Sequence, residues 1–158
     1  MIDKQYSPSV ASAQSGKKLD ALAEQFQRNI FQLPLPAPIA ATGMIIEGDG
    51  TKTGLVVIAH GIVLKGRFDQ VWLDNGRASK QLAGRIRFFR QSNDGRDFGE
   101  VLYQIVFDAL GNSRLGEGQN FSASIIPGKE DFVNTYRSVA LGLINAIHAN
   151  MDSPGNGA

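Results

Sequence analysis

The stretch that decides the fold is residues 82–107, LAGRIRFFRQSNDGRDFGEVLYQIVF. Asp94-Gly95 is a tight-turn dipeptide between two extended runs, which is typical of a β-hairpin. With a two-residue turn, one face pairs Phe88 with Val101, Ile86 with Tyr103, Gly84 with Ile105 and Leu82 with Phe107. These pairs are apolar or neutral, so we expect this face, including the side chains of Leu82, Ile86, Phe88, Tyr103, Ile105 and Phe107, to be buried. A slip of one residue would exchange it with the more polar face that carries Arg85, Arg87 and Phe89.

Two more turn dipeptides lie upstream, Asp49-Gly50 and Asn75-Gly76. They predict an antiparallel meander of five to six strands, at about 43–47, 53–66, 68–73, 78–90 and 98–109, with a sixth at 119–126. The strand at 53–66 has apolar residues on both faces, which indicates that both faces are covered. One helix covers one face, so the other face needs a further element or a second subunit.

Helical periodicity flanks this meander. Residues 17–33 place Leu19, Leu22, Phe26, Ile30 and Leu33 on one stripe, and residues 129–151 do the same with Phe132, Tyr136, Val139, Leu143, Ile147 and Met151. The PLPAP run at 34–38 ends the first helix because proline cannot continue it. The predicted fold class is α+β, with an N-terminal helix, the meander, and a long C-terminal helix packed on the sheet.

The expected domain organisation is a flexible segment at 1–16, a single α+β domain at 17–151 and a flexible tail at 152–158. A glycine-rich loop at 110–120 fits either a binding loop or a connector. The 158 residues are 42% hydrophobic and 20% charged, which is a globular composition. The chain has no cysteine, no apolar run long enough to span a bilayer and no signal peptide, so we expect a cytoplasmic protein.

Motifs for catalysis are incomplete. The segment Gly54–Gly61, GLVVIAHG, resembles the strand and His-Gly turn that help to form the oxyanion hole of α/β-hydrolases. That family's G-x-S-x-G elbow is absent, and a meander differs from the parallel hydrolase sheet. His60 and His148 are almost ninety residues apart and form no H-E-x-x-H motif, so we expect a core role for His60 and no metal site. The sequence predicts a non-catalytic protein without a cofactor.

Charge is segregated along the chain although the net charge is only +1. Residues 65–96 contain eight basic and three acidic residues, whereas residues 97–132 contain two basic and six acidic ones. Arg85, Arg87 and Phe89 share the outer face of one strand, and Arg67 lies in the same basic segment. Such a face fits single-stranded nucleic acid, with phosphates paired and bases stacked. Cross-strand pairing of the arginines to Glu100, Gln104 and Asp108 on the same face is the favoured interpretation, because the register was derived independently of the charges.

The C-terminal helix has one fixed charge, Arg137, between Phe132 and Met151. A helix that covers a sheet in a monomer normally keeps its outer half charged. We therefore expect a face centred on Val133, Leu141 and Ile144 to contact a second chain or another layer, with Gly142 permitting close approach.

The leading hypothesis is a non-catalytic assembly or interaction module. It would form a homo-oligomer or dock on a larger complex, with a protein as its partner. One alternative is single-stranded nucleic-acid binding through the basic face at 65–90. Another is a carrier of a small apolar ligand, because the last strands and the long final helix are similar in order to helix-grip ligand-binding domains.

Overall fold

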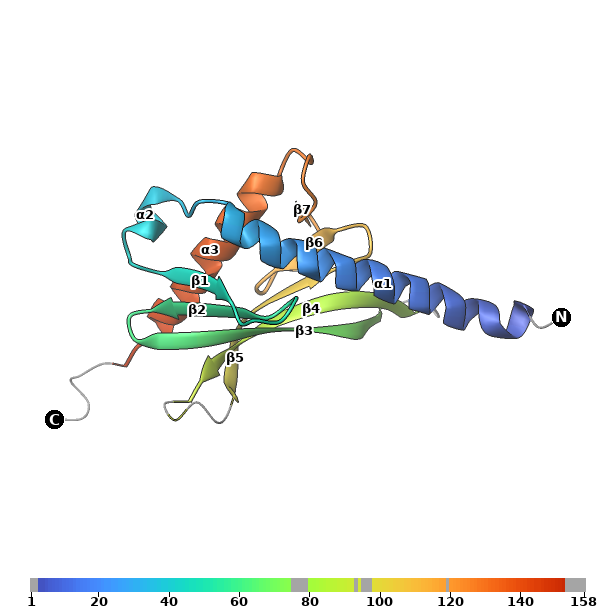
Figure 1. Cartoon of the computed structure of the whole chain (residues 1–158), viewed down its shortest axis with the longest axis horizontal. Helices are drawn as coiled ribbons and strands as arrows, with labels where there is room; N and C mark the ends of the chain where they lie inside the picture. Colours follow the sequence, from blue (N-terminus) through green and yellow to red (C-terminus); the bar gives the residue numbers. More distant parts are fainter. Residues whose placement is uncertain (1–2, 75–79, 93, 95–97, 119, 153–158) are drawn as a thin grey trace.

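A computed structural model describes residues 3–74, 80–92, 94, 98–118 and 120–152 of the chain (Figure 1). The helices are α1 (Asp3–Gln32), α2 (Ala37–Ala40) and α3 (Phe132–Ala149). The strands are β1 (Ile45–Gly48), β2 (Leu55–Ala59), β3 (Ile62–Asp74), β4 (Lys80–Gln91), β5 (Phe98–Phe107), β6 (Asn112–Leu115) and β7 (Ala123–Ser124). They form one curled antiparallel sheet in chain order. The α+β class is confirmed, with seven strands instead of five to six.

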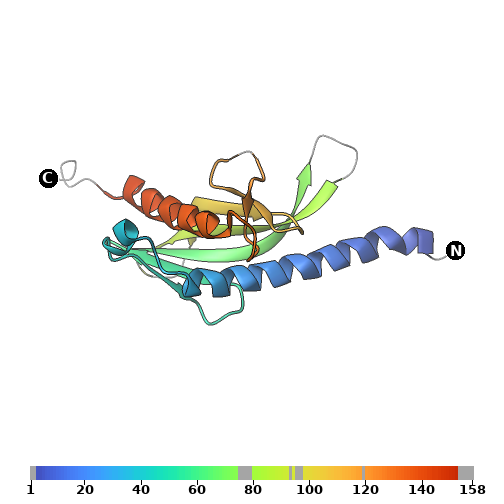
Figure 2. The same cartoon turned by 90° about the horizontal axis from the view of Figure 1, so that it is seen from above.

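Both long helices pack on the same face of this sheet (Figures 1 and 2). The apolar stripe of α1 is buried there through Leu19, Leu22, Phe26 and Ile30. The predicted stripe of α3 is buried from Tyr136 to Ile147, and the rings of Phe26 and Tyr136 stack with centroids 5.0 Å apart. The sheet contributes a layer of fully buried side chains that fills the space under the helices, namely Leu55, Val57, Leu64, Ile86, Phe88, Ile105 and Phe107.

Helix α1 is longer than its apolar stripe predicts, because it begins at Asp3 rather than near residue 17. Its N-terminal end extends past the sheet (Figures 1 and 2). Flexibility of residues 1–16 stays a prediction. The proline-rich connector also holds the short helix α2, whose first turn tolerates Pro38 because the N–H groups there need no intrahelical partner.

The predicted single strand at 53–66 is wrong. His60 and Gly61 have positive φ angles of 52° and 78° and join β2 to β3 in a two-residue turn, with Ala59 paired to Ile62. Positive φ at both central residues is the signature of a type I′ hairpin turn. The predicted break before residue 68 is absent as well, since β3 continues through Gly66, where the Phe88 ring occupies the space that a side chain would fill.

The predicted pairing of β4 with β5 has the correct buried face but the wrong partners. Phe88 faces Tyr103, Ile86 faces Ile105 and Gly84 faces Phe107, a shift of two residues from the register of a two-residue turn. Register shifts on either side of Phe89 give β5 two extra residues, so the side-chain alternation is restored. Of the six residues expected in the core here, Leu82 and Tyr103 are partly buried and the other four are buried.

Several predicted turns and ends fall on residues without a description. The dipeptide Asn75-Gly76, the glycine of Asp94-Gly95 and most of the C-terminal tail lie outside the described residues. The glycine-rich loop at 110–120 is not a plain loop, because β6 lies within it and pairs with β5 through Ile105 and Leu115. The predicted strand at 119–126 is reduced to β7, two residues long.

Candidate interaction surface

The sheet face opposite the helices, here termed the open face, is built from rows of side chains that the strand register aligns. One row crosses β1, β2 and β3 as Ile45, Ile58 and Val63. The next rows are Glu47, Val56, Lys65, Phe89 and Val101, then Arg67, Arg87 and Gln104, and then Asp69, Arg85, Val106 and Arg114. The open face is therefore mainly apolar at the β1–β2 end, where it also carries the acidic Glu47, and mainly cationic over β3 and β4.

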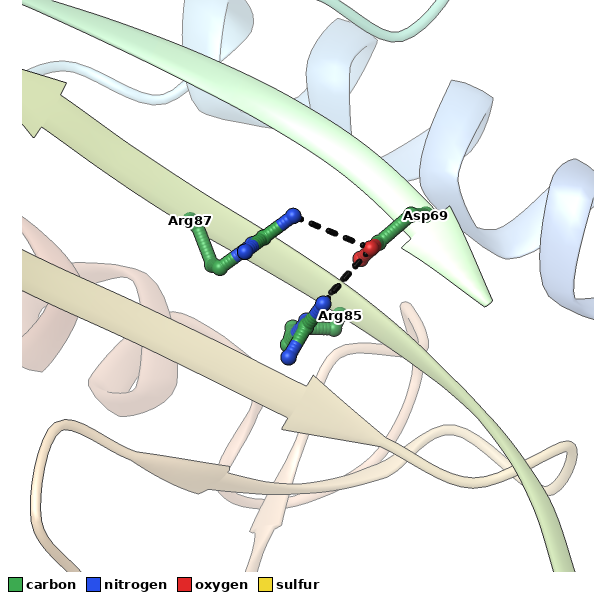
Figure 3. A network of polar contacts seen from close by, with 3 residues as sticks. All are labelled: Asp69, Arg85 and Arg87. Atoms are coloured by element: carbon green, nitrogen blue, oxygen red, sulfur yellow. Dashed lines mark hydrogen bonds and ion pairs between the residues drawn. The ribbon is translucent and has the colours of Figure 1, made fainter. Parts of the chain in front are cut away.

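An ion-pair cluster lies at the centre of the cationic part (Figure 3). Arg85 binds the Asp69 carboxylate with two hydrogen bonds, from Nε at 3.0 Å and from Nη2 at 2.7 Å. Arg87 Nη2 donates to the same carboxylate at 3.1 Å. The hydrogen bond from Arg85 lowers the pKa of Asp69, against an opposing effect of burial, and the same bond raises the pKa of Arg85. One carboxylate thus holds two guanidinium groups in place.

Positive charge remains in excess around this cluster. Arg67 is exposed and lies directly opposite Arg87 in the β3–β4 register, and like charges at facing positions repel. The Arg87 guanidinium lies 5.0 Å from the centre of the Phe89 ring, and the buried Nε of Arg87 has no hydrogen-bond acceptor among the described residues. Arg85 and Arg114 flank the buried Val106 in the register, and the Arg114 guanidinium lies 5.3 Å from the centre of the Phe121 ring.

The second apolar face of the segment 53–66, which we expected to be covered by a further element or a second subunit, is the apolar part of the open face. No described element covers the side chains of Val56, Ile58 and Val63 on that side, and each is half-buried. Ile45 on the adjacent edge strand is 49% exposed. The described part of the chain therefore leaves this face uncovered. The covering element that the doubly apolar pattern predicts is not found among the described residues.

The arginines pair across strands as expected, and Gln104 lies opposite Arg87, but the carboxylate that they bind is not one of those expected. The carboxylate that binds Arg85 and Arg87 is on β3, whereas Asp108 instead accepts backbone hydrogen bonds from Leu110 and Asn112 at 3.0 Å, in the turn after β5. Asp69 belongs to the same basic segment, 65–96, but sequence reasoning assigned it no role.

The three residues proposed on the C-terminal helix separate in the structure. Ile144 is only 3% exposed and belongs to the core, so it is not available to a partner. Val133 is 41% and Leu141 51% exposed on the outer side of α3. Val133 and Arg137 line a shallow groove against Leu33, Leu35 and two prolines of the connector. Gly142 does not admit a second chain, because a side chain there would meet the ring of Tyr103.

The two histidines, expected to be unrelated, are neighbours. Their ring centroids lie 5.0 Å apart, and both residues are exposed, so the prediction that His60 has a core role is wrong. Within the described residues, no group of three or more histidine, cysteine, aspartate or glutamate side chains is arranged to hold a metal ion.

Comparison of the chain with protein-family models, with curated proteins and with solved structures gave no significant match. Among the described residues, no helix is both long and apolar enough to cross a membrane. The geometry of the described surfaces is therefore the basis for assigning a function.

Proposed function

We propose that the protein is a non-catalytic interaction module that docks on a protein partner through the open face. The observation that carries this proposal is the continuity of an apolar row, Ile45, Ile58 and Val63, with the cationic rows centred on Arg85 and Arg87. A buried apolar contact beside charge complementarity is the usual composition of a protein interface. The partner is an acidic polypeptide segment that also presents apolar side chains.

Two features favour a protein over single-stranded nucleic acid on this surface. Branched aliphatic side chains such as Ile45 and Ile58 offer nothing to phosphates and little to base stacking, which uses aromatic rings. Phe89, the ring that could stack, already lies under the Arg87 guanidinium. Self-pairing of two open faces is disfavoured because both would present the same cationic rows.

A direct test uses three fluorescent probes in anisotropy titrations: a peptide alternating glutamate with leucine, an all-glutamate peptide of equal charge, and oligothymidylate. We expect the mixed peptide to bind at least tenfold more tightly than the other two. The double variant Arg85→Gln/Arg87→Gln should lose that binding, and Ile45→Thr, which stays β-branched, should weaken it. Lys17→Gln/Lys18→Gln on α1 removes the same charge and should leave binding unchanged.

Tighter binding of oligothymidylate, with a steep salt dependence, would establish the nucleic-acid alternative instead. Equal binding by the wild type and the arginine double variant would refute the open face as the site. The carrier alternative receives no support, because fully buried side chains fill the space between sheet and helices.

A second candidate function is self-association through α3, which the exposure of Val133 and Leu141 favours. The occupant is a second copy of the chain, because the outer side of α3 carries one fixed charge, Arg137, and two such sides meet with little repulsion. In sedimentation velocity, Leu141→Glu should convert a concentration-dependent dimer to a monomer. Leu110→Glu, at a position that is 72% exposed after β5, adds the same charge and should leave the dimer intact. A wild type that stays monomeric at high concentration would exclude this function.

A further inference from the structure

The two histidines of the chain meet where the β2–β3 turn reaches the C-terminal end of α3 (Figure 1). His60 is in the turn and His148 is in the last turn of the helix. Their rings are tilted by 41°, with centroids 5.0 Å apart. We propose that His60 and His148 together bind one divalent transition metal ion of the Zn²⁺ or Cu²⁺ kind, which joins the turn to the helix end.

Packed neighbours hold both backbones in position. His60 has a left-handed φ of 52°, and Ala59 and Ile62, which close the turn, are 3% and 8% exposed. His148 follows Ile147, which is fully buried under the helix. The fold therefore places the two residues side by side, and binding of a metal has to fix only their exposed side chains.

The separation of the rings suits a shared ion. Zinc binds histidine nitrogen at about 2.0–2.1 Å, which places the ion about 3.2 Å from each ring centroid. For two ligands at the tetrahedral angle, the centroids are then about 5.2 Å apart. The observed 5.0 Å is close to this value, so the spacing of the two rings is compatible with a shared ion once a nitrogen of each ring turns toward it.

The surroundings decide the kind of ion. Imidazole suits zinc, copper and nickel, whereas magnesium and calcium prefer oxygen ligands. The negative end of the α3 dipole favours a cation at His148. Arg90 lies beside this site, where it donates a hydrogen bond to the Asn150 carbonyl at 2.9 Å. Its positive charge repels a metal ion and limits the affinity of the site for it. A polar hollow of about 300 Å³ lies next to the turn, lined by Gly61, Arg90, Ser92 and Asp94. Both histidines are exposed, so water can fill the remaining coordination positions.

The experiment uses untagged protein, because the chain has no cysteine and only these two histidines. Isothermal titration with Zn²⁺ and Cu²⁺ should give one ion per chain, with Cu²⁺ the tighter, and Mg²⁺ should give no heat. Saturating Zn²⁺ should raise the Tm, since an ion that binds only the folded chain stabilises it. The variants His60→Asn and His148→Gln should each weaken binding at least tenfold. Asparagine is chosen at position 60 because it tolerates a left-handed φ.

Three results would overturn the proposal. The first is absence of binding at millimolar metal. The second is binding that survives both single variants. The third is a stoichiometry of one ion per two chains accompanied by dimerisation, which would show that the histidines of different molecules share the ion. If either variant lowers the Tm of the metal-free protein, the binding comparison is made at a temperature at which circular dichroism shows both proteins fully folded.

Discussion

Replacing Gly84 with alanine tests the observed register of β4 and β5. Gly84 lies directly opposite Phe107 on the buried face, and an added Cβ would lie 2.3 Å from Cζ of the Phe107 ring. The ring is fully buried, so it has no free space into which to move. In the register expected from a two-residue turn, Gly84 would face Ile105, and this clash with Phe107 would not arise.

The size of the effect follows from two opposing contributions. Overpacking a well-filled core costs about 1–3 kcal/mol. Alanine regains about 0.5–1 kcal/mol relative to glycine because it restricts the unfolded chain. The two ranges leave a net loss in the free energy of unfolding of about 0–2.5 kcal/mol. The severe overlap with the buried Phe107 ring argues for the upper part of it, about 1–2 kcal/mol, which for a chain of this length lowers the Tm by about 2–8 °C.

Thermal and urea unfolding followed by circular dichroism measures this loss. The matched control is Gly48→Ala in β1, where the nearest atom is the end of the exposed Phe31 ring at 3.2 Å, and we expect no loss there. Combining Gly84→Ala with Phe107→Leu should cost less than the sum of the two single changes. A Gly84→Ala protein as stable as the wild type, or strict additivity with Phe107→Leu, would refute the packing described.

Three further outcomes are expected. Phe107→Ala should cost about 3–5 kcal/mol in chemical denaturation, because it empties a fully buried site. Asp69 has a lowered pKa in the folded state, so its stabilising contribution is present above the unfolded pKa of about 3.9 and is lost as the pH falls through the lower folded value. Asp69→Asn should flatten the acid limb of a stability–pH profile, with an effect below about 1 kcal/mol because the ion pair is partly exposed. Burial raises the pKa of Tyr103 to about 12, so stability should fall as the pH rises from about 10 to 12, and Tyr103→Phe should remove part of that fall.

The buried and open faces of β4 and β5 could be predicted from sequence because side chains alternate with a period of two. The partners across the hairpin could not, since the two extra residues in β5 preserve that alternation and leave no mark on the hydrophobic pattern. The His60-Gly61 turn was missed for a related reason. Apolar residues continue on both sides of it, and the common turn dipeptides for this geometry begin with asparagine or aspartate.

The partner of the arginines was missed because it depends on a long-range register. A two-residue turn at Asn75-Gly76 would place Asp69 opposite Leu82, whereas the observed pairing places it opposite Arg85. The apolar stripe of α3 is confirmed, but helical periodicity did not tell which of the apolar residues beside the stripe face the core and which face outward. Ile144 completes the core, while Leu141, three residues earlier, is exposed.

The open face and the outer side of α3 lie on opposite sides of the sheet, which separates the two proposed contacts physically. A dimer formed through Leu141 would leave both open faces accessible, and a partner that carries two acidic segments would gain affinity through multivalency. Substitutions at distant sites without shared contacts act additively. Leu141→Glu should therefore abolish dimers without changing the affinity of a single chain for the acidic peptide, and Arg85→Gln/Arg87→Gln should do the reverse. Loss of peptide binding in Leu141→Glu would mean that the two surfaces are coupled, and the partner site would then have to include residues from both chains.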